Sequence, residues 1–355
     1  MRRVLFFFSV LFTLPAVAQI GGSSAFQFLD LTNSARATAL GGTVISIRDQ
    51  DINLAVINPA LNDSTLDNKL ALNYTKYLPD VNINYGFVSY AKSFKNIGTF
   101  NGNLQYVNYG NFIEADPAGL QTGTFTASDY SFNLGYGKII GKADSNKLFS
   151  LGANAKFIYS QLYTVFSSGA AIDLGANYYS AKHNFSASFL IRNMGRQFKT
   201  YTTGNAEPLP FEALAGISFK PKHAPFRLSI TGTHLQVWDL TYIDPANPPV
   251  TSDPLTGQPI KQNKYKIFGD KLMRHVLFGA EILLTKNFNI QLGYNYERRQ
   301  ELMVDSRRGL IGTSFGFGFR IYKFHLNYGH ASYHIAGGSN TFSVTTNLSD
   351  FYSRK

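Results

Sequence analysis

The sequence predicts an all-β fold, a fourteen-stranded antiparallel transmembrane β-barrel with an N-terminal hatch segment in its lumen. Apolar and polar residues alternate with period two over most of the chain after residue 68. Only 15% of the residues are charged, although the chain has 30 Phe and 21 Tyr. Long and short connections between the expected strands also alternate. A membrane barrel explains this composition because it turns apolar side chains outward and polar side chains inward.

Residues 1–18 have the pattern of a secretory signal peptide. Arg2 and Arg3 precede an apolar run over residues 4–14, and residues 16–18 read Ala-Val-Ala, the form of a cleavage site. The run is too short for a transmembrane helix, and no later stretch reaches eighteen apolar residues, which excludes a helical membrane protein. We therefore expect cleavage after Ala18 and a location in the bacterial outer membrane. The chain has no cysteine, so disulfide bonds and thiolate chemistry are excluded.

Alternation predicts fourteen strands after the N-terminal region. Between Phe149 and Ser160, for example, Phe, Leu, Ala and Tyr fill one set of alternate positions, while Ser, Gly, Asn and Lys fill most of the other. Aromatic residues near the ends of the apolar faces fit the girdles at the two membrane interfaces. The expected strands span residues 68–78, 81–94, 97–109, 126–142, 147–163, 167–181, 184–195, 209–220, 225–240, 272–285, 288–297, 308–321, 323–332 and 339–351.

The lengths of the connections support a membrane barrel independently. The even-numbered connections are all short, and every long connection is odd-numbered. Outer-membrane barrels have short periplasmic turns and long outer loops, so this sorting places both chain ends in the periplasm. A secreted soluble β-protein is the alternative, but it has no reason to sort its loops by parity. The long connections are expected at Gly110–Phe125, Gly195–Pro208, Thr241–Lys271, Glu297–Arg307 and Ala331–Asn340.

Residues 19–67 are expected to form a hatch between the signal peptide and the barrel of residues 68–355. Thr32 or Asn33 is placed to cap a short helix over residues 34–40, and a glycine pair ends it. A second short helix is expected to begin near two aspartates and to run to about Ile57. Acidic residues there are favoured by the helix dipole. Pro59 keeps Asn58 out of the helical region and predicts a turn.

The apolar residues of this segment need burial, and the lumen of a fourteen-stranded barrel is wide enough to hold a plug. We therefore predict that the segment is a lumenal plug. The residues that define its motif are Ser34, Arg36, Gly41, Gly42, Asp49, Asp51, Asn58, Pro59 and Ala60.

This arrangement resembles the FadL family of outer-membrane proteins, in which a fourteen-stranded barrel carries an N-terminal hatch with an Asn-Pro-Ala triplet. Three stretches resemble more closely the start of the PorQ proteins of the type IX secretion system of Bacteroidetes. They are "FQFLDLTNSARATALGG", "ISIRDQDINLAVINPALN" and "LALNYTKYLPDVNINYGFVSYA". The related PorV proteins share only the first pieces of this pattern. The similarity is densest over residues 21–95 and continues loosely through the barrel.

The resemblance to PorQ implies an outer-membrane component of the secretion system's attachment complex. Such a barrel would anchor a PorZ-like surface protein and support cargo attachment beside PorU and PorV, where exported proteins are joined to lipopolysaccharide. The resemblance to FadL implies an alternative, a transporter of small hydrophobic compounds. A transporter needs an apolar pocket that reaches from the outer loops to the hatch, with an exit through the wall, whereas an anchor needs neither.

The residues themselves predict neither an enzyme nor a metal or cofactor site. His325, His330 and His334 stand in a strand-and-loop context without cysteine, and the sequence contains no metalloprotease, hydrolase or phosphate-loop motif. The formal charge of +11 favours an anionic partner such as lipopolysaccharide or an acidic protein. Nucleic acid is not expected for an exported chain, and basic loops without a dedicated ligand are an equal alternative.

The longest loop, residues 241–271, is the candidate surface for a protein partner. Its prolines stiffen it, which lowers the entropy lost on binding, and its second half is basic. A loop that merely shields the mouth of the barrel is an equal alternative. The residues expected to contact a partner are Tyr242, Pro245, Pro248, Pro249, Pro254, Pro259, Lys261 and Lys264.

Overall fold

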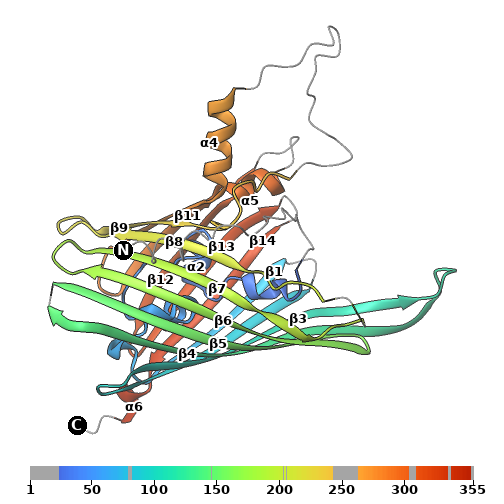
Figure 1. The fold of residues 1–355 in the computed structure, drawn as a ribbon, viewed down its shortest axis with the longest axis horizontal. Coiled ribbons are helices and arrows are strands. Elements are labelled where there is room, and N and C mark those ends of the chain that lie inside the picture. Colours follow the sequence, from blue (N-terminus) through green and yellow to red (C-terminus); the bar gives the residue numbers. More distant parts are fainter. Residues whose placement is uncertain are drawn as a thin grey trace, which may run out of the picture.

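A computed structural model describes residues 24–78, 82–144, 146–202, 204, 206–242, 263–303, 309–334 and 337–352. Fourteen antiparallel strands close into a single barrel, in which each strand pairs with its neighbours in sequence and β1 pairs with β14 (Figure 1). The predicted fold is confirmed. The predicted signal peptide and its cleavage site lie outside the described residues.

The strands follow the predicted order. Their bounds are β1 Lys69–Leu78, β2 Ile83–Phe94, β3 Gly98–Ala115, β4 Gln121–Asp144, β5 Lys147–Leu162, β6 Val165–Ser180, β7 Phe185–Lys199, β8 Glu212–Phe219, β9 Phe226–Gly232, β10 Val276–Ile282, β11 Phe288–Asn295, β12 Thr313–Ile321, β13 Phe324–His334 and β14 Gly337–Asn347.

Several predicted loops are wrong because strands continue into them. The third connection, expected as a loop, is mostly a two-stranded ribbon formed by the ends of β3 and β4, which pair as far as Ala115 and Gln121. The ribbon projects beyond the rim of the barrel (Figure 1). The connections expected at 195–208 and 331–340 are likewise shortened, because β7 reaches Lys199 and β13 reaches His334.

Other predicted strands are too long because helices or an irregular residue interrupt them. β9 ends at Gly232, two residues before His234 adopts a left-handed backbone with φ of 53°. β10 begins only after α4 (Lys264–Arg274), a helix in the loop expected to be irregular. The side chain of Asn295 caps α5 (Tyr296–Leu302), so β11 ends there. A short helix, α6 (Ser349–Tyr352), follows β14.

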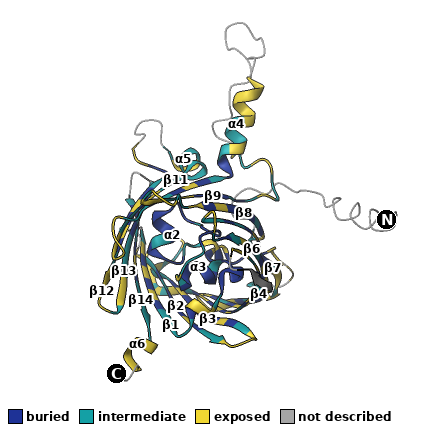
Figure 2. Cartoon of the chain, turned by 90° about the vertical axis from the view of Figure 1, so that its left-hand side faces the viewer, coloured by how far each residue is buried: buried dark blue, intermediate teal, exposed yellow. Residues whose placement is uncertain are grey.

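Outward and inward side chains differ as the alternation predicts. On β5, Phe149 and Phe157 are 45% and 52% exposed on the outside, whereas Ser150 and Asn154 are buried inside. Figure 2 shows the same alternation of exposed (yellow) and buried (dark blue) residues along the strands of the wall. An apolar exterior around a polar, filled interior is the architecture of an outer-membrane barrel. None of the described helices is long and apolar enough to span a membrane.

The hatch lies inside the barrel, as predicted (Figure 2). It is built from η2 (Gln27–Asp30), α2 (Ala35–Ala39), α3 (Ile52–Ile57), η3 (Pro59–Leu61) and η4 (Ser64–Leu66). Most of its apolar side chains form a cluster with inward residues of β1 and β2, and the rest pack in two further clusters. Each fully buried Leu or Ile of this cluster contributes roughly 1.5–3 kcal/mol of stabilisation.

Candidate functional site

Side-chain caps fix the local structure of the hatch. Ser34 has an extended backbone and accepts a hydrogen bond from the amide of Ala37, so the cap of α2 is Ser34 and not Thr32 or Asn33 as predicted. Gly41 and Gly42 end this helix with φ of 106° and 128°, values that glycine adopts without strain. Asp51 accepts from the amide of Asn53 and caps α3, which confirms the predicted start of the second helix.

The Asn-Pro-Ala triplet holds two parts of the hatch together. Asn58 is fully buried, and its Nδ2 donates to the carbonyl of Ile45 at 2.8 Å. Its Oδ1 accepts from the amide of Ala60 at 3.1 Å. Pro59 begins η3, so the predicted turn is present. The triplet therefore fixes how the chain leaves α3 and passes to the wall.

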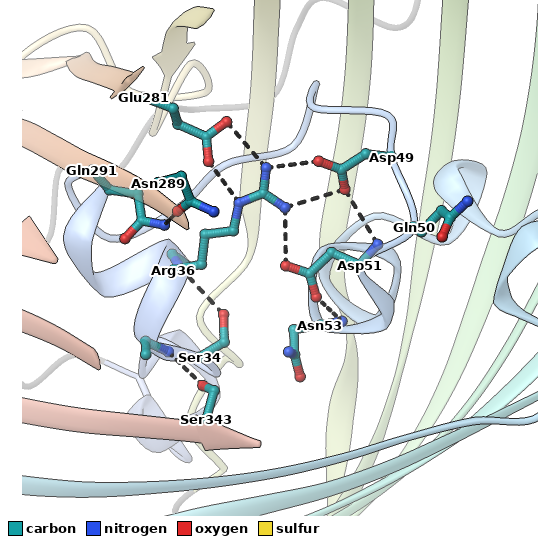
Figure 3. A network of polar contacts seen from close by, with 12 residues as sticks. Ser34, Arg36, Asp49, Gln50, Asp51, Asn53, Glu281, Asn289, Gln291 and Ser343 are labelled. Carbon is teal, nitrogen blue, oxygen red and sulfur yellow. Dashed lines mark hydrogen bonds and ion pairs between the residues drawn. The ribbon is translucent and has the colours of Figure 1, made fainter. Parts of the chain in front are cut away.

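A network of charged side chains joins the hatch to the barrel wall (Figure 3). Arg36 of α2 donates to Glu281 of β10 from Nε and Nη2, at 2.8 and 3.0 Å. The same guanidinium contacts Asp49 at 2.7 Å and Asp51 at 3.1 Å. Arg227 of β9 lies 2.9 Å from Asp49 and 2.8 Å from Glu281. Three residues of the predicted hatch motif, Arg36, Asp49 and Asp51, thus form ion pairs with each other and with Glu281 and Arg227 of the wall.

The network is largely buried, and its charges depend on each other. Burial alone would raise the pKa of Asp49, but the guanidinium groups of Arg36 and Arg227 hold that pKa well below its usual range. The side chain of Glu281 is 2% exposed. Breaking a buried ion pair by removing one partner costs roughly 3–5 kcal/mol, because the other charge stays buried without compensation. The network therefore resists displacement of the hatch.

A second link joins the hatch to β5 and β6. Arg48 donates to Ser150 at 2.9 Å and to Asn177 at 3.1 Å, and it pairs with Asp63 of the hatch at 3.0 Å. Its side chain is 5% exposed. The hatch is therefore held by guanidinium groups on two sides of the lumen.

Inward glycines of the wall receive the backbone of the hatch. A Cβ placed on Gly152 of β5 would lie 2.2 Å from the carbonyl carbon of Pro59, and one on Gly329 of β13 would lie 2.1 Å from the carbonyl oxygen of Ala35. Real Cβ atoms do not approach backbone atoms so closely, so these positions admit no larger residue while the hatch stays in place. A Cβ on Gly137, Gly175 or Gly293 would lie 2.2–2.3 Å from an atom of the hatch, and one on Gly316 would lie 2.6 Å from the Cβ of Ala39.

A cavity of about 830 Å³ lies between the hatch and the outer loops. The hatch contributes Phe28 and Leu31, the wall contributes Tyr109 and Tyr333, and Phe211 belongs to the segment before β8. Specific ligand sites usually measure roughly 300–1,000 Å³ and combine an apolar lining with a few polar groups. The cavity has the size and the mixed lining of a small-molecule site.

Charged groups of the cavity are partly paired. Arg192 contacts Glu212 at 2.5 Å and Asp30 at 3.1 Å. Burial raises the pKa of Asp30 to about 6, against the opposing charge of Arg192, even though the cavity leaves 39% of the side chain open. Burial likewise raises the pKa of Glu297 in α5 to about 7. Near neutral pH the cavity is therefore less negative than its count of carboxyl groups indicates.

A second cavity, of about 550 Å³, lies on the other side of the hatch, towards the short turns. Arg36, Asp49 and Asp51 line it together with Arg320 and Asp350. The two cavities share no lining residue, and the buried core of the hatch lies between them. A compound in the outer cavity can reach the lower one only if the hatch moves.

The predicted partner loop is described only at its ends. Tyr242 is 56% exposed, and Lys264 is the first residue of α4. Their roles in binding a partner stay predictions. The other residues of that prediction, Pro245, Pro248, Pro249, Pro254, Pro259 and Lys261, lie outside the described residues.

Sequence reasoning missed the wall partners of the hatch. Arg227 and Glu281 are charged residues at inward positions of their strands, and this was the signal that the sequence offered. Nothing in the sequence, however, indicates that Glu281 pairs with Arg36, which lies 245 positions away. His330 contacts the amide oxygen of Asn340 at 3.0 Å. Among the described residues, no group of three or more His, Cys, Asp or Glu is placed to hold a metal ion.

Comparisons with known proteins concern only the architecture. No protein-family profile and no curated protein matches the chain. The Pseudomonas putida toluene transporter TodX is 11% identical, with a TM-score of 0.49, over 89% of this chain and 97% of that chain. A Pseudomonas aeruginosa FadL homologue is 11% identical, with a TM-score of 0.48, over 89% and 98%. KdgM porin is 5% identical, with a TM-score of 0.34, over 79% and 99%.

All three TM-scores are below 0.5, so the architecture rests on the strand pairing of this chain itself. That pairing gives the predicted architecture, a closed fourteen-stranded barrel around an N-terminal plug. The finer resemblance to PorQ proteins stays a prediction.

Proposed function

We propose that this barrel takes up small compounds that combine an apolar body with a polar group. The observation that carries this proposal is the cavity of about 830 Å³ between the outer loops and the hatch. Phe28, Leu31, Tyr109 and Phe211 supply an apolar and aromatic surface for the body of such a compound. A paired Arg192 and the carboxyl groups around it supply hydrogen bonds for its polar group.

The hatch gives this function its second step. A compound in the cavity lies directly on the hatch, since Gly41, Gly42 and Thr43 line its floor. Arg298 of α5 donates to the carbonyl of Gly41 at 3.3 Å and lies over the ring of Tyr333 at 4.2 Å. An occupant that competes for Arg298 weakens this contact between α5 and the hatch. Uptake therefore consists of binding above the hatch, followed by its displacement.

Filling the cavity tests this proposal. Gln27 and Glu301 line the cavity with exposed side chains, so replacing both with tryptophan adds two rings to the open space. We expect binding of radiolabelled 1-naphthol to the barrel in nanodiscs to fall at least tenfold, because the rings occupy the site. Equilibrium dialysis measures this, with protein-free nanodiscs subtracted.

The matched control is Gln161→Trp, which adds the same ring at an exposed position of β5 that does not line the cavity. It is expected to bind like the wild type. Binding that is equal in the filled and the control variants would place the ligand elsewhere and overturn the proposal. So would a wild-type barrel that binds no member of a panel of small aromatic alcohols, amines and acids.

A second candidate function is favoured by the ribbon formed by β3 and β4. It projects past the rim and exposes Ile113 and Leu120 at 68% and 70%, with Phe112 and Phe125 stacked at 5.1 Å between its strands. Exposed apolar residues on a paired, preordered ribbon suit a protein partner. With the sequence resemblance to PorQ proteins, this supports a role as the anchor of a PorZ-like surface protein, working with PorU and PorV in attaching cargo to lipopolysaccharide.

Shortening the ribbon tests the anchor. Replacing residues 113–124 with Asn-Gly closes the hairpin next to the Phe112–Phe125 pair, and a two-residue turn of this type suits a hairpin. The barrel is expected to reach the outer membrane in normal amounts, because the removed residues lie beyond its wall. The surface partner should be lost to the medium, as measured by immunoblotting of cells and medium.

A second variant, Ile113→Ser with Leu120→Ser, keeps the length of the ribbon and removes only its exposed apolar side chains. An anchor that uses the apolar tip loses its partner in this variant too. Full retention of surface proteins in both variants, at normal barrel levels, would rule out the ribbon as an anchor.

A further inference from the structure

α4 stands out sideways from the barrel wall, roughly across the barrel axis, in both views (Figures 1 and 2). Among the described residues, its contacts with the barrel are made from Phe268 onward. His275, the residue that follows it, is buried, and its two ring nitrogens lie 2.8 Å from the carbonyl of Thr233 and 3.2 Å from that of Trp238. A helix fixed in this way extends parallel to the plane of the membrane.

The most exposed apolar residues of the helix share one side, whereas Ile267, 37% exposed, lies outside it. Tyr265, Phe268 and Leu272 are spaced as i, i+3 and i+7, which places them on one face, and they are 89%, 56% and 44% exposed. Asp270 projects from the opposite side, where it accepts a hydrogen bond from the hydroxyl of Tyr296 in α5 at 2.7 Å. The apolar face is therefore turned away from α5. Trp238, 51% exposed and 5.4 Å from the ring of Phe268, extends this face to the barrel rim.

The strands that flank α4 are the shortest of the barrel, so the wall extends less far along the membrane normal at this point. β9 and β10 have 7 residues each, whereas β3 and β4 have 18 and 24. Seven residues span roughly 23 Å along a strand, and less along the membrane normal, because barrel strands are tilted by about 35–45°. The apolar band of such barrels is about 25 Å tall. The base of α4 therefore lies near the outer edge of the apolar layer and not far above it.

The rest of the helix surface is basic. Lys271 pairs with Asp239 at 2.6 Å, and Arg274 pairs with Asp270 at 2.9 Å. In the part of the chain that the structure describes, Lys264 and Lys266 form no ion pair. Aromatic and aliphatic residues on one side, with lysines beside them, are the composition of helices that lie in a membrane interface. Lysines at that depth meet the phosphate groups of anionic lipids.

We propose that α4 is an interfacial helix that lies on the outer leaflet, with Tyr265, Phe268 and Leu272 among the acyl chains and Lys264 and Lys266 on lipid phosphates. The occupant of this surface is an anionic, phosphate-bearing lipid layer such as one containing lipid A. The helix continues the apolar exterior of the barrel sideways, where the wall itself is too short. This inference is independent of what the lumen binds.

Site-directed spin labelling tests the placement directly, because the chain has no native cysteine. Phe268→Cys and Lys266→Cys, each in the full-length barrel, carry a nitroxide on the apolar and on the polar side of α4. In vesicles of phosphatidylcholine with lipid A, we expect the label at 268 to be relaxed by oxygen and shielded from a water-soluble nickel chelate, and the label at 266 to show the reverse. A label at Leu120, on the tip of the projecting ribbon, is the aqueous control.

Trp238 provides a label-free check, because it is the single tryptophan of the chain. Its fluorescence in the wild-type barrel is expected to be quenched by lipids brominated near the headgroup. Labels at 266 and 268 that are equally open to the nickel chelate, or a Trp238 that brominated lipids do not quench, would mean that the helix stands in water as a surface for a protein and would overturn the proposal.

The phosphate contacts are tested by Lys264→Gln with Lys266→Gln. With the nitroxide at 268, this variant is expected to become at least twofold more accessible to the nickel chelate in vesicles with lipid A, and to be unchanged in pure phosphatidylcholine. An equal effect in both vesicles, or none in either, would overturn the assignment of these lysines to lipid phosphates.

Discussion

Replacing Arg36 with methionine is expected to unseal the lumen. The substitution leaves Asp49, Asp51 and Glu281 close together with only Arg227 to compensate them. The loss of one partner from such a buried network costs roughly 3–5 kcal/mol. The other charged contacts of the hatch, such as those of Arg48 with β5 and β6, do not compensate these carboxylates, so this loss should favour its displaced state. Single-barrel conductance in planar bilayers is expected to rise from near zero to frequent or lasting open levels.

A second substitution distinguishes charge from shape. Asp49→Asn removes one of the uncompensated carboxylates, so the double variant with Arg36→Met should recover much of the seal. A purely steric role for Arg36 predicts no recovery. The surface pair of Lys92 and Asp67 provides the control: both side chains are about two-fifths exposed, and Lys92→Met should leave the conductance unchanged.

The network also predicts how the seal depends on pH. The folded hatch holds the pKa of Asp49 well below its usual value. A lowered pKa stabilises the folded state fully above the unfolded value, near 4, and this contribution is lost as the pH falls through the folded value. The wild-type barrel should therefore stay closed at pH 5. Conductance that opens between pH 7 and pH 5 would contradict this assignment.

Gly152→Val is expected to displace the hatch to a similar degree, by a steric clash and not by the loss of an ion pair. Even a Cβ at this position would lie 2.2 Å from the carbonyl carbon of Pro59, and backbone atoms cannot move aside as a flexible side chain can. Overpacking of this kind usually costs about 1–3 kcal/mol, and more where the backbone must shift. The strands do not need the hatch contact at this position, so the barrel should persist while η3 leaves the wall.

The exposure of the hatch gives the measurement. A cysteine at Leu61, which is 3% exposed in the closed state, should react with a membrane-impermeant maleimide only when Gly152 is replaced. Gly102→Val is the matched control, because that glycine faces outward and its nearest neighbour would be a methyl group of Leu134 at 4.0 Å. Equal labelling of both variants would show that the hatch does not rest on Gly152.

The sequence predicted what local patterns determine. Period-two alternation located all fourteen strands, and the residues around Asp51 and Pro59 located α3 and the turn after it, because caps and prolines act over a few positions. α4 was missed because the five prolines upstream in the loop marked it as irregular, although Lys264 to Arg274 contains none. The inward glycines of the wall were predicted only as part of a polar face. The reason that a side chain is excluded there is the backbone of the docked hatch, which the sequence does not show.

The contacts of α2 also constrain how the barrel is assembled. The amide of Ala35 donates to Ser343 of β14 at 2.8 Å, and Thr38 lies 3.1 Å from Thr341 of the same strand. β14 is the last strand to be synthesised and closes the seam with β1. A segment that is synthesised before every strand is thus packed against the last strand. We therefore expect the hatch to lie in the lumen before β14 completes its pairing with β1, because the contacts of α2 with β14 form only where both segments are present.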